Sequence, residues 1–284
     1  MNKSFYITTP IYYVNDIPHI GHAYTTILAD VLSRYQKQLG NDSFFLTGLD
    51  EHGQKVQDAA TKRGIDPTDH CDEISKRFTS LWEKLHISND DFIRTTENRH
   101  KNVVKEILKI VKLSGYEDRR INQLSGGQNQ RVSIARALTL NPEYILADEP
   151  VSMIDASNRA EILYLMKDLQ QKYGVSYIYI THDIATARHF SDKIAIMYAG
   201  RIIETGNPRE IIDDPLHPYT KALMESIPKL ETKTKRLKAL KGMVPSILEL
   251  GEGCKLCSRF DPKDCACGGT KIEPKLIEVK KDHY

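Results

Sequence analysis

The first forty residues change from strand-like to helix-like spacing of apolar positions. The run at residues 5–14, FYITTPIYYV, has the continuous apolar and aromatic character of a strand. Beyond Gly21 the apolar positions recur on one helical face: Ile27, Val31, Tyr35 and Leu39. We predict a helix there that ends at Gly40.

The same alternation continues to residue 113. Residues 43–48, SFFLTG, predict a short buried strand, and residues 54–63 and 67–85 have a helical period. An amphipathic helix follows over residues 99–113. Strands alternating with helices predict the opening of a doubly wound α/β fold.

A second α/β pattern begins after a boundary near residues 105–115, without an opening strand of its own. Its predicted helices cover residues 127–140 and 157–173, with a short one after residue 181, and its predicted strands cover residues 144–148, 175–181, 193–199 and 200–205. The sequence therefore predicts an α/β protein with two incomplete parallel-sheet halves. No internal repeat relates them.

Composition narrows the class of protein. With 284 residues, of which 40% are hydrophobic and 27% charged, the chain has the balance of a globular protein large enough for two domains. It lacks a charged start followed by an apolar stretch, and no run approaches the ~20 apolar residues that span a bilayer. We expect a cytoplasmic protein.

The charge of the chain is nearly balanced. A net charge of +2 indicates no overall attraction to nucleic acid. Residues 229–242 are locally basic, and we interpret them as a solvated helix or linker.

The pentapeptide LSGGQ at residues 124–128 opens a predicted helix. The hydroxyl of Ser125 and the amides of Gly126 and Gly127 would form a concave donor site at the positive helix end, which suits a terminal phosphate. Glycine lets the backbone approach a phosphate closely. By itself, a short SGG sequence is equally consistent with an ordinary loop.

Two carboxylates end the predicted strand at residues 144–148. On a buried strand, Asp148 can hold magnesium through water while Glu149 polarises an attacking water. His182, at the end of the next strand, can contact a γ-phosphate and orient water. Each feature alone has a plainer alternative, namely solvated acids or a structural histidine.

Together with SMID at residues 152–155, these motifs resemble the signature, Walker B motif, D-loop and switch histidine of ATP-binding-cassette ATPases. The resemblance implies ATP and Mg²⁺, with Glu149 and His182 as catalytic residues. It also implies a second ATPase subunit and membrane permease subunits, at the inner face of the plasma membrane. The implied ATP contacts are Ser125, Gly126, Gly127, Gln128, Asp148 and Asp155.

The rear segment resembles the tail of oligopeptide and dipeptide importer ATPases, at residues 217–230 (HPYTKALMESIPKL) and 242–257. That family's tail ends in a cysteine-bearing segment that holds a metal or iron–sulfur cluster. Here the cysteines are Cys254, Cys257, Cys265 and Cys267, with the pattern C-x2-C-x7-C-x-C. Four thiolates could close a zinc site or hold an iron–sulfur cluster; free thiols are the alternative.

A cassette ATPase also needs the phosphate loop G-x-x-x-x-G-K-[ST], and the sequence contains no match. The nearest string, residues 48–55, misplaces the lysine by one position and lines the loop with Asp50 and Glu51, which would repel phosphate. In the family, the signature of one subunit acts on ATP held by the other's phosphate loop. We therefore expect this chain to complete only a partner's site, leaving Glu149 idle.

Residues 6–22, YITTPIYYVNDIPHIGH, resemble the first strand and HIGH motif of class I aminoacyl-tRNA synthetases, specifically the methionyl-tRNA synthetases. TGLDEHG at residues 47–53 extends the resemblance, which runs to about Ile107. It implies ATP, methionine and tRNA(Met) as ligands. The implied ATP contacts are His19, Gly21 and His22, and the implied methionine contacts are Ile11, Tyr13 and Asp50. A carboxylate opposite the methionine ammonium is sound chemistry; for Asp50 the alternative is a helix N-cap.

Three hypotheses follow. The chain is a cassette ATPase subunit of a peptide importer, a methionine–tRNA ligase, or a chimera with neither complete activity. We favour the chimera, with a synthetase-like fragment over residues 1–107, a cassette fragment over 108–228 and an importer tail over 229–284. The synthetase's KMSKS loop, zinc-bearing insertion and anticodon-binding domain have no counterpart here, so adenylation is expected to fail. Apolar strand edges without partners predict marginal stability or aggregation.

Overall fold

The computed structural model describes residues 3–227, 246, 252–256, 259 and 274–284. The chain forms two compact units. The front unit comprises Met1–Leu124 and Arg131–Thr139, and the rear unit comprises Ser125–Gln130 and Leu140–Tyr284. The fold class is α/β with parallel sheets, as predicted. These units are defined by packing, whereas the boundary near residue 107 concerns ancestry and stays a prediction.

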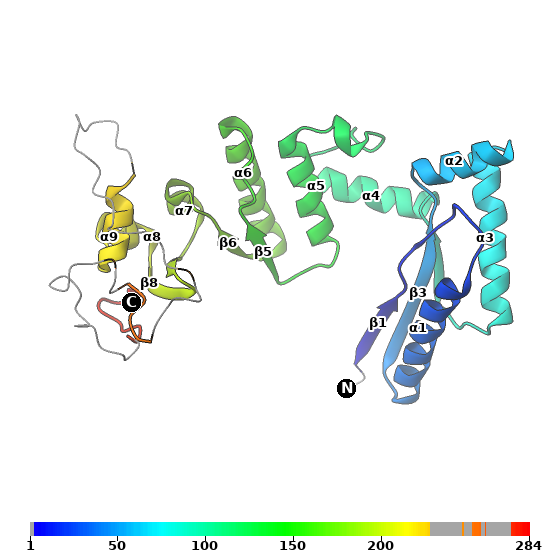
Figure 1. Ribbon diagram of the computed structural model, residues 1–284, viewed down its shortest axis with the longest axis horizontal. Coiled ribbons are helices and arrows are strands. Elements are labelled where there is room, and N and C mark those ends of the chain that lie inside the picture. Colours follow the sequence, from blue (N-terminus) through cyan, green and yellow to red (C-terminus); the bar gives the residue numbers. More distant parts are fainter. Residues whose placement is uncertain (1–2, 228–245, 247–251, 257–258, 260–273) are drawn as a thin grey trace. The chain divides into compact units, whose positions relative to one another are not determined.

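A four-stranded parallel sheet forms the centre of the front unit (Figure 1). Its strands are β1 (Ser4–Thr8), β2 (Tyr12–Tyr13), β3 (Asp42–Asp50) and β4 (Asp91–Arg94), and β3 pairs with the other three. The strand expected over residues 43–48 is confirmed. The run at residues 5–14 instead forms two strands, because Pro10 between them has no N–H to donate to a ladder.

Four whole helices lie in the front unit: α1 (Ile20–Gln38), α2 (Gln54–Arg63), α3 (Pro67–Lys84) and α4 (Asn98–Ile110). The 3-10 turn η1 (Ile121–Gln123) and most of α5 (Gly126–Leu138) also belong to it. Asp66 caps α3 by accepting a hydrogen bond from the Thr68 amide at 2.7 Å, with proline at the first helical position. The helix α3 packs its apolar face against the carboxyl end of the sheet. Its core comprises Tyr12, Val14, Leu49, Val56, Cys71, Ile74, Phe78 and Trp82.

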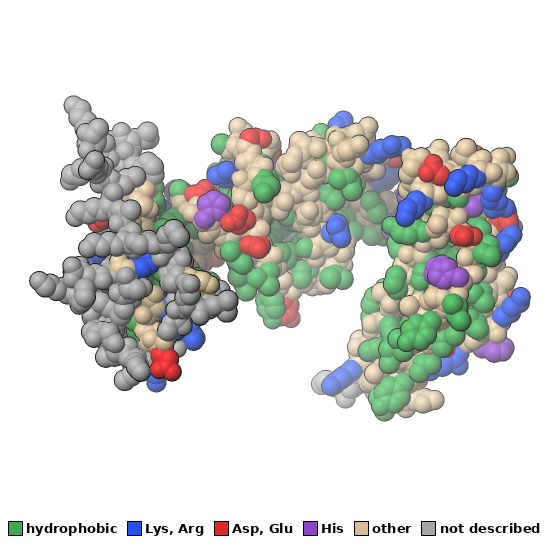
Figure 2. All heavy atoms as spheres, in the orientation of Figure 1, with side chains coloured by type: hydrophobic (Ala, Val, Ile, Leu, Met, Phe, Trp, Pro, Cys, Tyr) green, Lys and Arg blue, Asp and Glu red, His purple; other side chains and the backbone are tan. Residues whose placement is uncertain are grey.

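The apolar face predicted for α1 is present in the helix, but it is exposed to solvent. Ile27, Val31, Tyr35 and Leu39 have exposed fractions of 41, 54, 53 and 58%. The helix instead buries Thr26, Ala29, Asp30 and Ser33, which are smaller or hydrogen-bonded. Figure 2 shows hydrophobic side chains at the surface of this unit. In a doubly wound fold such a face is covered by further elements, and the described residues of the front unit supply none.

The rear unit contains a two-stranded parallel sheet of β5 (Tyr144–Asp148) and β6 (Ser176–Ile180). It is flanked by α6 (Ala156–Tyr173) and α7 (Ile184–Phe190), and α5 (Gly126–Leu138) begins in this unit. The predicted strands and helices are confirmed within one or two residues. One face of the sheet is exposed, through Tyr144, Leu146, Ile178 and Ile180.

The last part of the rear unit is built on an antiparallel hairpin of β7 (Ile194–Tyr198) and β8 (Arg201–Gly206). Two short helices follow, α8 (Pro208–Asp213) and α9 (Pro218–Glu225). Ala187, Ile194, Ile196 and Ile211 form the small core here. In the part of the chain that the structure describes, no helix is long and apolar enough to cross a membrane.

Candidate nucleotide sites

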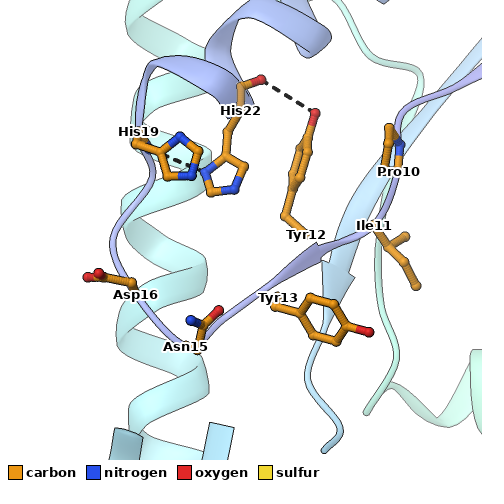
Figure 3. A pocket seen from close by; sticks show the side chains of 8 residues that line it. All are labelled: Pro10, Ile11, Tyr12, Tyr13, Asn15, Asp16, His19 and His22. Carbon is orange, nitrogen blue, oxygen red and sulfur yellow. Dashed lines mark hydrogen bonds between the residues drawn. The ribbon is translucent and has the colours of Figure 1, made fainter. Parts of the chain in front are cut away.

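A hollow of about 440 Å³ lies between β2 and the start of α1 (Figure 3). It is lined by Pro10, Ile11, Tyr12, Tyr13, Asn15, Asp16, His19 and His22. Four of the predicted site residues, Ile11, Tyr13, His19 and His22, are thus brought together. Sequence reasoning missed Asn15 and Asp16, although both lie in the segment that joins the strand to the HIGH helix.

The two histidines of the HIGH motif are fixed by a reciprocal cap at the start of α1. Nδ1 of His19 accepts the amide of Gly21 at 3.1 Å, and Nδ1 of His22 accepts the amide of His19 at 3.2 Å. Because each Nδ1 is an acceptor, the neutral ring carries its proton on Nε2. The pair therefore presents two Nε2–H donors beside a positive helix end.

Close packing around this cap explains Gly21. A Cβ at this position would lie 3.0 Å from Cε1 of His19, so a side chain here would require the His19 ring to shift. Figure 3 shows the two rings side by side next to Tyr12, with their centroids 3.7 Å apart. Burial, and then the nearby charge of His19, lowers the pKa of His22, which favours its neutral form.

Asp50 ends β3 and is the register partner of Tyr13 in β2. Its carboxylate accepts the amide of His52 at 3.1 Å. The N-cap of α2 is Gly53, which makes no side-chain cap, so the alternative in which Asp50 caps this helix is not observed. Asp50 does not line the hollow, and its proposed contact with methionine stays a prediction.

The string at residues 48–55 has the wrong structure for a phosphate loop. Gly48 lies inside β3, where an added Cβ would be 2.2 Å from the carbonyl oxygen of Ile93. The side chain of Glu51 is buried, 2.6 Å from Nε of Arg94, and also accepts the hydroxyl of Thr96. In this string, Gly48 allows close packing of the strands, and Glu51 is the buried carboxylate of an ion pair with Arg94.

In the rear unit, the signature residues Ser125 and Gln128 form a capping box. Oγ of Ser125 accepts the Gln128 amide at 3.3 Å, and Oε1 of Gln128 accepts the Ser125 amide at 2.9 Å. Gly126 and Gly127 lie between these two residues and are the first residues of α5. A Cβ on Gly127 would lie 3.3 Å from that of Asn158, so this glycine permits close approach of α6.

Asp148 and Glu149 follow β5 as predicted, and His182 follows β6. Nδ1 of His182 lies 2.9 Å from Oε1 of Glu149. Glu149 adopts a φ of 44°, a left-handed conformation that is uncommon for a residue with a side chain and recurs at functional sites. The hydrogen bond from His182 holds the pKa of Glu149 below its usual range.

Sequence reasoning missed Arg159, which joins the D-loop to the segment after His182. Its guanidinium lies 3.1 Å from the carboxylate of Asp183 and donates to the carbonyl of Ile154 at 3.4 Å. Asp155, the predicted D-loop residue, caps α6 by accepting the amide of Asn158 at 3.0 Å. Arg159 lies one helical turn after Asp155, which caps α6, and this spacing was the sequence signal that could have indicated it.

Of the four rear cysteines, only Cys254 belongs to the described residues, and it is half-buried. Cys257, Cys265 and Cys267 lie outside them. Among described residues, no group of three or more potential ligands could hold a metal ion. The remaining cysteine, Cys71, is buried, and this burial raises the pKa of its thiol to about 11, which makes it a poor nucleophile or ligand.

Comparison with known proteins relates each end of the chain to a different family. A family model described as tRNA synthetases class I (M) matches residues 5–152, more than half of the chain. A putative oligopeptide transport ATP-binding protein of Bacillus subtilis is 40% identical over 267 residues, 90% of this chain and 79% of its own length. The chain belongs to both families. Its rear also matches, at residues 203–267, a model described as the C-terminal region of oligopeptide/dipeptide transporters.

Pairwise relatives from each family cover part of the chain. Methionine–tRNA ligase of Rickettsia conorii is 61% identical over 104 residues, 37% of this chain. A dipeptide transport ATP-binding protein of Escherichia coli is 40% identical over 182 residues, 63% of this chain. The chain spans about a fifth of the ligase and about half of the dipeptide transport protein. Similarity to the synthetases and to the peptide-transport ATPases confirms both predicted resemblances.

Proposed function

We propose that this chain is a fusion of a methionyl-tRNA synthetase front with a peptide-importer ATPase rear, and that it completes the catalytic cycle of neither. The observation that carries the proposal is the structure of residues 48–55. This is the closest string to a phosphate loop in the sequence, yet Gly48 is packed within β3 and Glu51 is a buried partner of Arg94. Without amides to wrap a β-phosphate, Asp148 and Glu149 have no bound nucleotide of their own to act upon.

The front site retains part of its chemistry. His19, Gly21 and His22 present donors suited to ATP phosphates, and Ile11 and Tyr13 line the same hollow. Asp50 would take the methionine ammonium. The KMSKS loop, which stabilises pyrophosphate in the synthetases, has no counterpart in the sequence. We infer that this site contacts ATP or methionine at most weakly and forms no adenylate.

Two assays on purified full-length protein test the proposal. Methionine-dependent exchange of pyrophosphate into ATP should not exceed that of the Asp50→Asn variant. ATP hydrolysis should not exceed that of Glu149→Gln, which keeps the shape of the side chain without its charge. Clear activity above either control would refute the proposal and would identify the ligase or the ATPase as the surviving function.

A second candidate function rests on the signature. The capping box of Ser125 and Gln128 holds the start of α5 with Gly126 and Gly127 in place, which suits a γ-phosphate bound by another subunit. The chain would then act with a complete ATPase subunit and permease subunits, with Mg²⁺ supplied at the partner's phosphate loop. Co-expression with an intact cassette ATPase tests this: Ser125→Arg should change the ATPase rate of the mixture, and an unchanged rate would dispose of the idea.

Metal binding at the rear cysteines is a separate proposal. Four thiolates at Cys254, Cys257, Cys265 and Cys267 would suit zinc or an iron–sulfur cluster. Anaerobically purified protein should then carry stoichiometric zinc or iron that is lost in Cys254→Ser and kept in Cys71→Ala. Wild-type protein without such metal would end this proposal.

A further inference from the structure

The terminal residues 279–284 pack onto the hairpin of the rear unit. The amide of Thr205 in β8 donates to the carbonyl of Tyr284 at 3.0 Å, and the amide of Tyr284 donates back to Thr205 at 2.9 Å. Lys280 and His283 form a β-bridge with each other, and Lys280 pairs with Asp214 at the end of α8. The chain therefore turns back on itself here and extends the edge of the hairpin.

A buried side-chain contact between a histidine and a carboxylate anchors this turn. His283 is completely buried, and its Nε2 lies 2.7 Å from Oε1 of Glu204, a β8 residue with an exposed fraction of 1%. A Cβ on Gly206 would lie 3.2 Å from Cδ2 of His283, so the ring sits tightly on the strand. Such a contact leaves little room for water and leaves neither group exposed.

The same carboxylate also holds the start of α9. Oε1 of Glu204 accepts the amide of Leu216 at 2.7 Å, and its Oε2 accepts the amide of His217 at 3.1 Å. Burial alone would raise the pKa of Glu204, but the Thr220 side chain, these two amides and His283 lower it below its usual range, so the group is an anion at neutral pH. A buried carboxylate with several partners is costly to leave with fewer.

We propose that residues 279–284 are a terminal clasp that opens and closes as a unit, and that Glu204 couples the clasp to the start of α9. The carboxylate fixes both ends of the stretch from His217 to His283, which contains all four rear cysteines. The clasp is thus a conformational device that is independent of either proposed nucleotide site.

Amide hydrogen exchange on the full-length protein tests this inference. In His283→Ala, exchange at Thr205 and Tyr284 should accelerate roughly 10- to 100-fold, as expected when a buried acceptor loses its partner. Leu216 and His217 should also accelerate, because they share Glu204. The amide of Glu149, which donates to Ile180 in the parallel sheet, should keep its rate. Lys281→Ala, an exposed change in the same turn, is the matched control and should leave all of these amides unchanged.

A second variant separates local opening from general destabilisation. His283→Gln keeps a donor near the position of Nε2, so it should retain most of the protection at Thr205. Unchanged exchange at Thr205 and Tyr284 in His283→Ala would overturn the clasp. Equal acceleration at Glu149 and Thr205, in both variants, would show that His283 supports only overall stability and would overturn it as well. Acceleration at Thr205 without any at Leu216 and His217 would refute the coupling through Glu204.

Discussion

The carboxylate of Glu51 is buried 2.6 Å from the guanidinium of Arg94, directly after the strand that ends in Asp50. This pair joins the ends of β3 and β4, and Arg94 also reaches Asp72 in α3 at 2.5 Å. This pair gives the acidic residue of the string at residues 48–55 a structural role. Glu51 therefore contributes to the packing of the front unit.

Arg94→Met should strongly destabilise the front unit. Removing Arg94, whose side chain is 24% exposed, leaves the buried carboxylate of Glu51 without its cation and with the Thr96 hydroxyl as a remaining donor, at a cost of about 3 kcal/mol in the free energy of unfolding. Trp82 is the single tryptophan of the chain and is buried in the front core, so its fluorescence during urea unfolding reports on this unit. The control is Arg77→Met, which removes the exposed pair with Glu73 and should cost no more than about 1 kcal/mol. Equal effects would contradict this account of Glu51.

Phe78 is the second test of the front core. Its ring is completely buried and lies between Tyr12, at 5.8 Å between centroids, and Trp82, also at 5.8 Å. Phe78→Ala should lower the free energy of unfolding by about 3–5 kcal/mol, because a cavity remains. Phe44, which is 46% exposed, provides the same substitution outside the core. A loss at Phe44→Ala as large as at Phe78→Ala would show that the described packing is wrong.

The Glu149–His182 contact predicts a pH-dependent interaction. Because the hydrogen bond lowers the pKa of Glu149, the contact is fully present above the carboxyl's ordinary value of 4.5 and is lost as the pH falls through its lowered value. In His182→Ala the Glu149 carboxyl should titrate at a higher pH than in the wild type. Carbon-detected NMR titration measures this directly, with Glu161 as an internal reference. An unchanged Glu149 titration would mean that the contact does not form in solution.

The exposed face of α1 predicts self-association. Leu28 and Val31 have exposed fractions of 50 and 54%, and an uncovered apolar helix face of this length is rare on a stable monomer. Sedimentation velocity should show association that grows with protein concentration. Replacing both with glutamate should shift the protein toward the monomer, whereas Gln38→Glu, which adds a charge at the exposed end of the same helix, should not. A wild-type protein that stays monomeric at every concentration would contradict this reading of the face.

The sequence alone determined the order and type of most elements and both family resemblances. Local signals were enough for this. Gly40 and Gly64 mark the ends of helices, and Asp66 with Pro67 marks the start of one. The motifs at residues 19–22 and 124–128 consist of neighbouring residues, so they can be recognised in the sequence alone. Pro10 divided the first expected strand in two, a local effect that sequence reasoning passed over. The helix α9 and the strand β4 were likewise not predicted, since both are short.

Only the tertiary structure decided which faces and which charges are buried. Apolar spacing in α1 predicted a helix but not its orientation, and the structure buries Thr26, Asp30 and Ser33 there because burial depends on what packs against a face. The pairs of Glu51 with Arg94 and of Glu204 with His283 join residues far apart in the chain, so no periodicity reveals them. Sequence spacing reports local backbone geometry, whereas polar contacts to buried carboxylates depend on how distant segments meet in space.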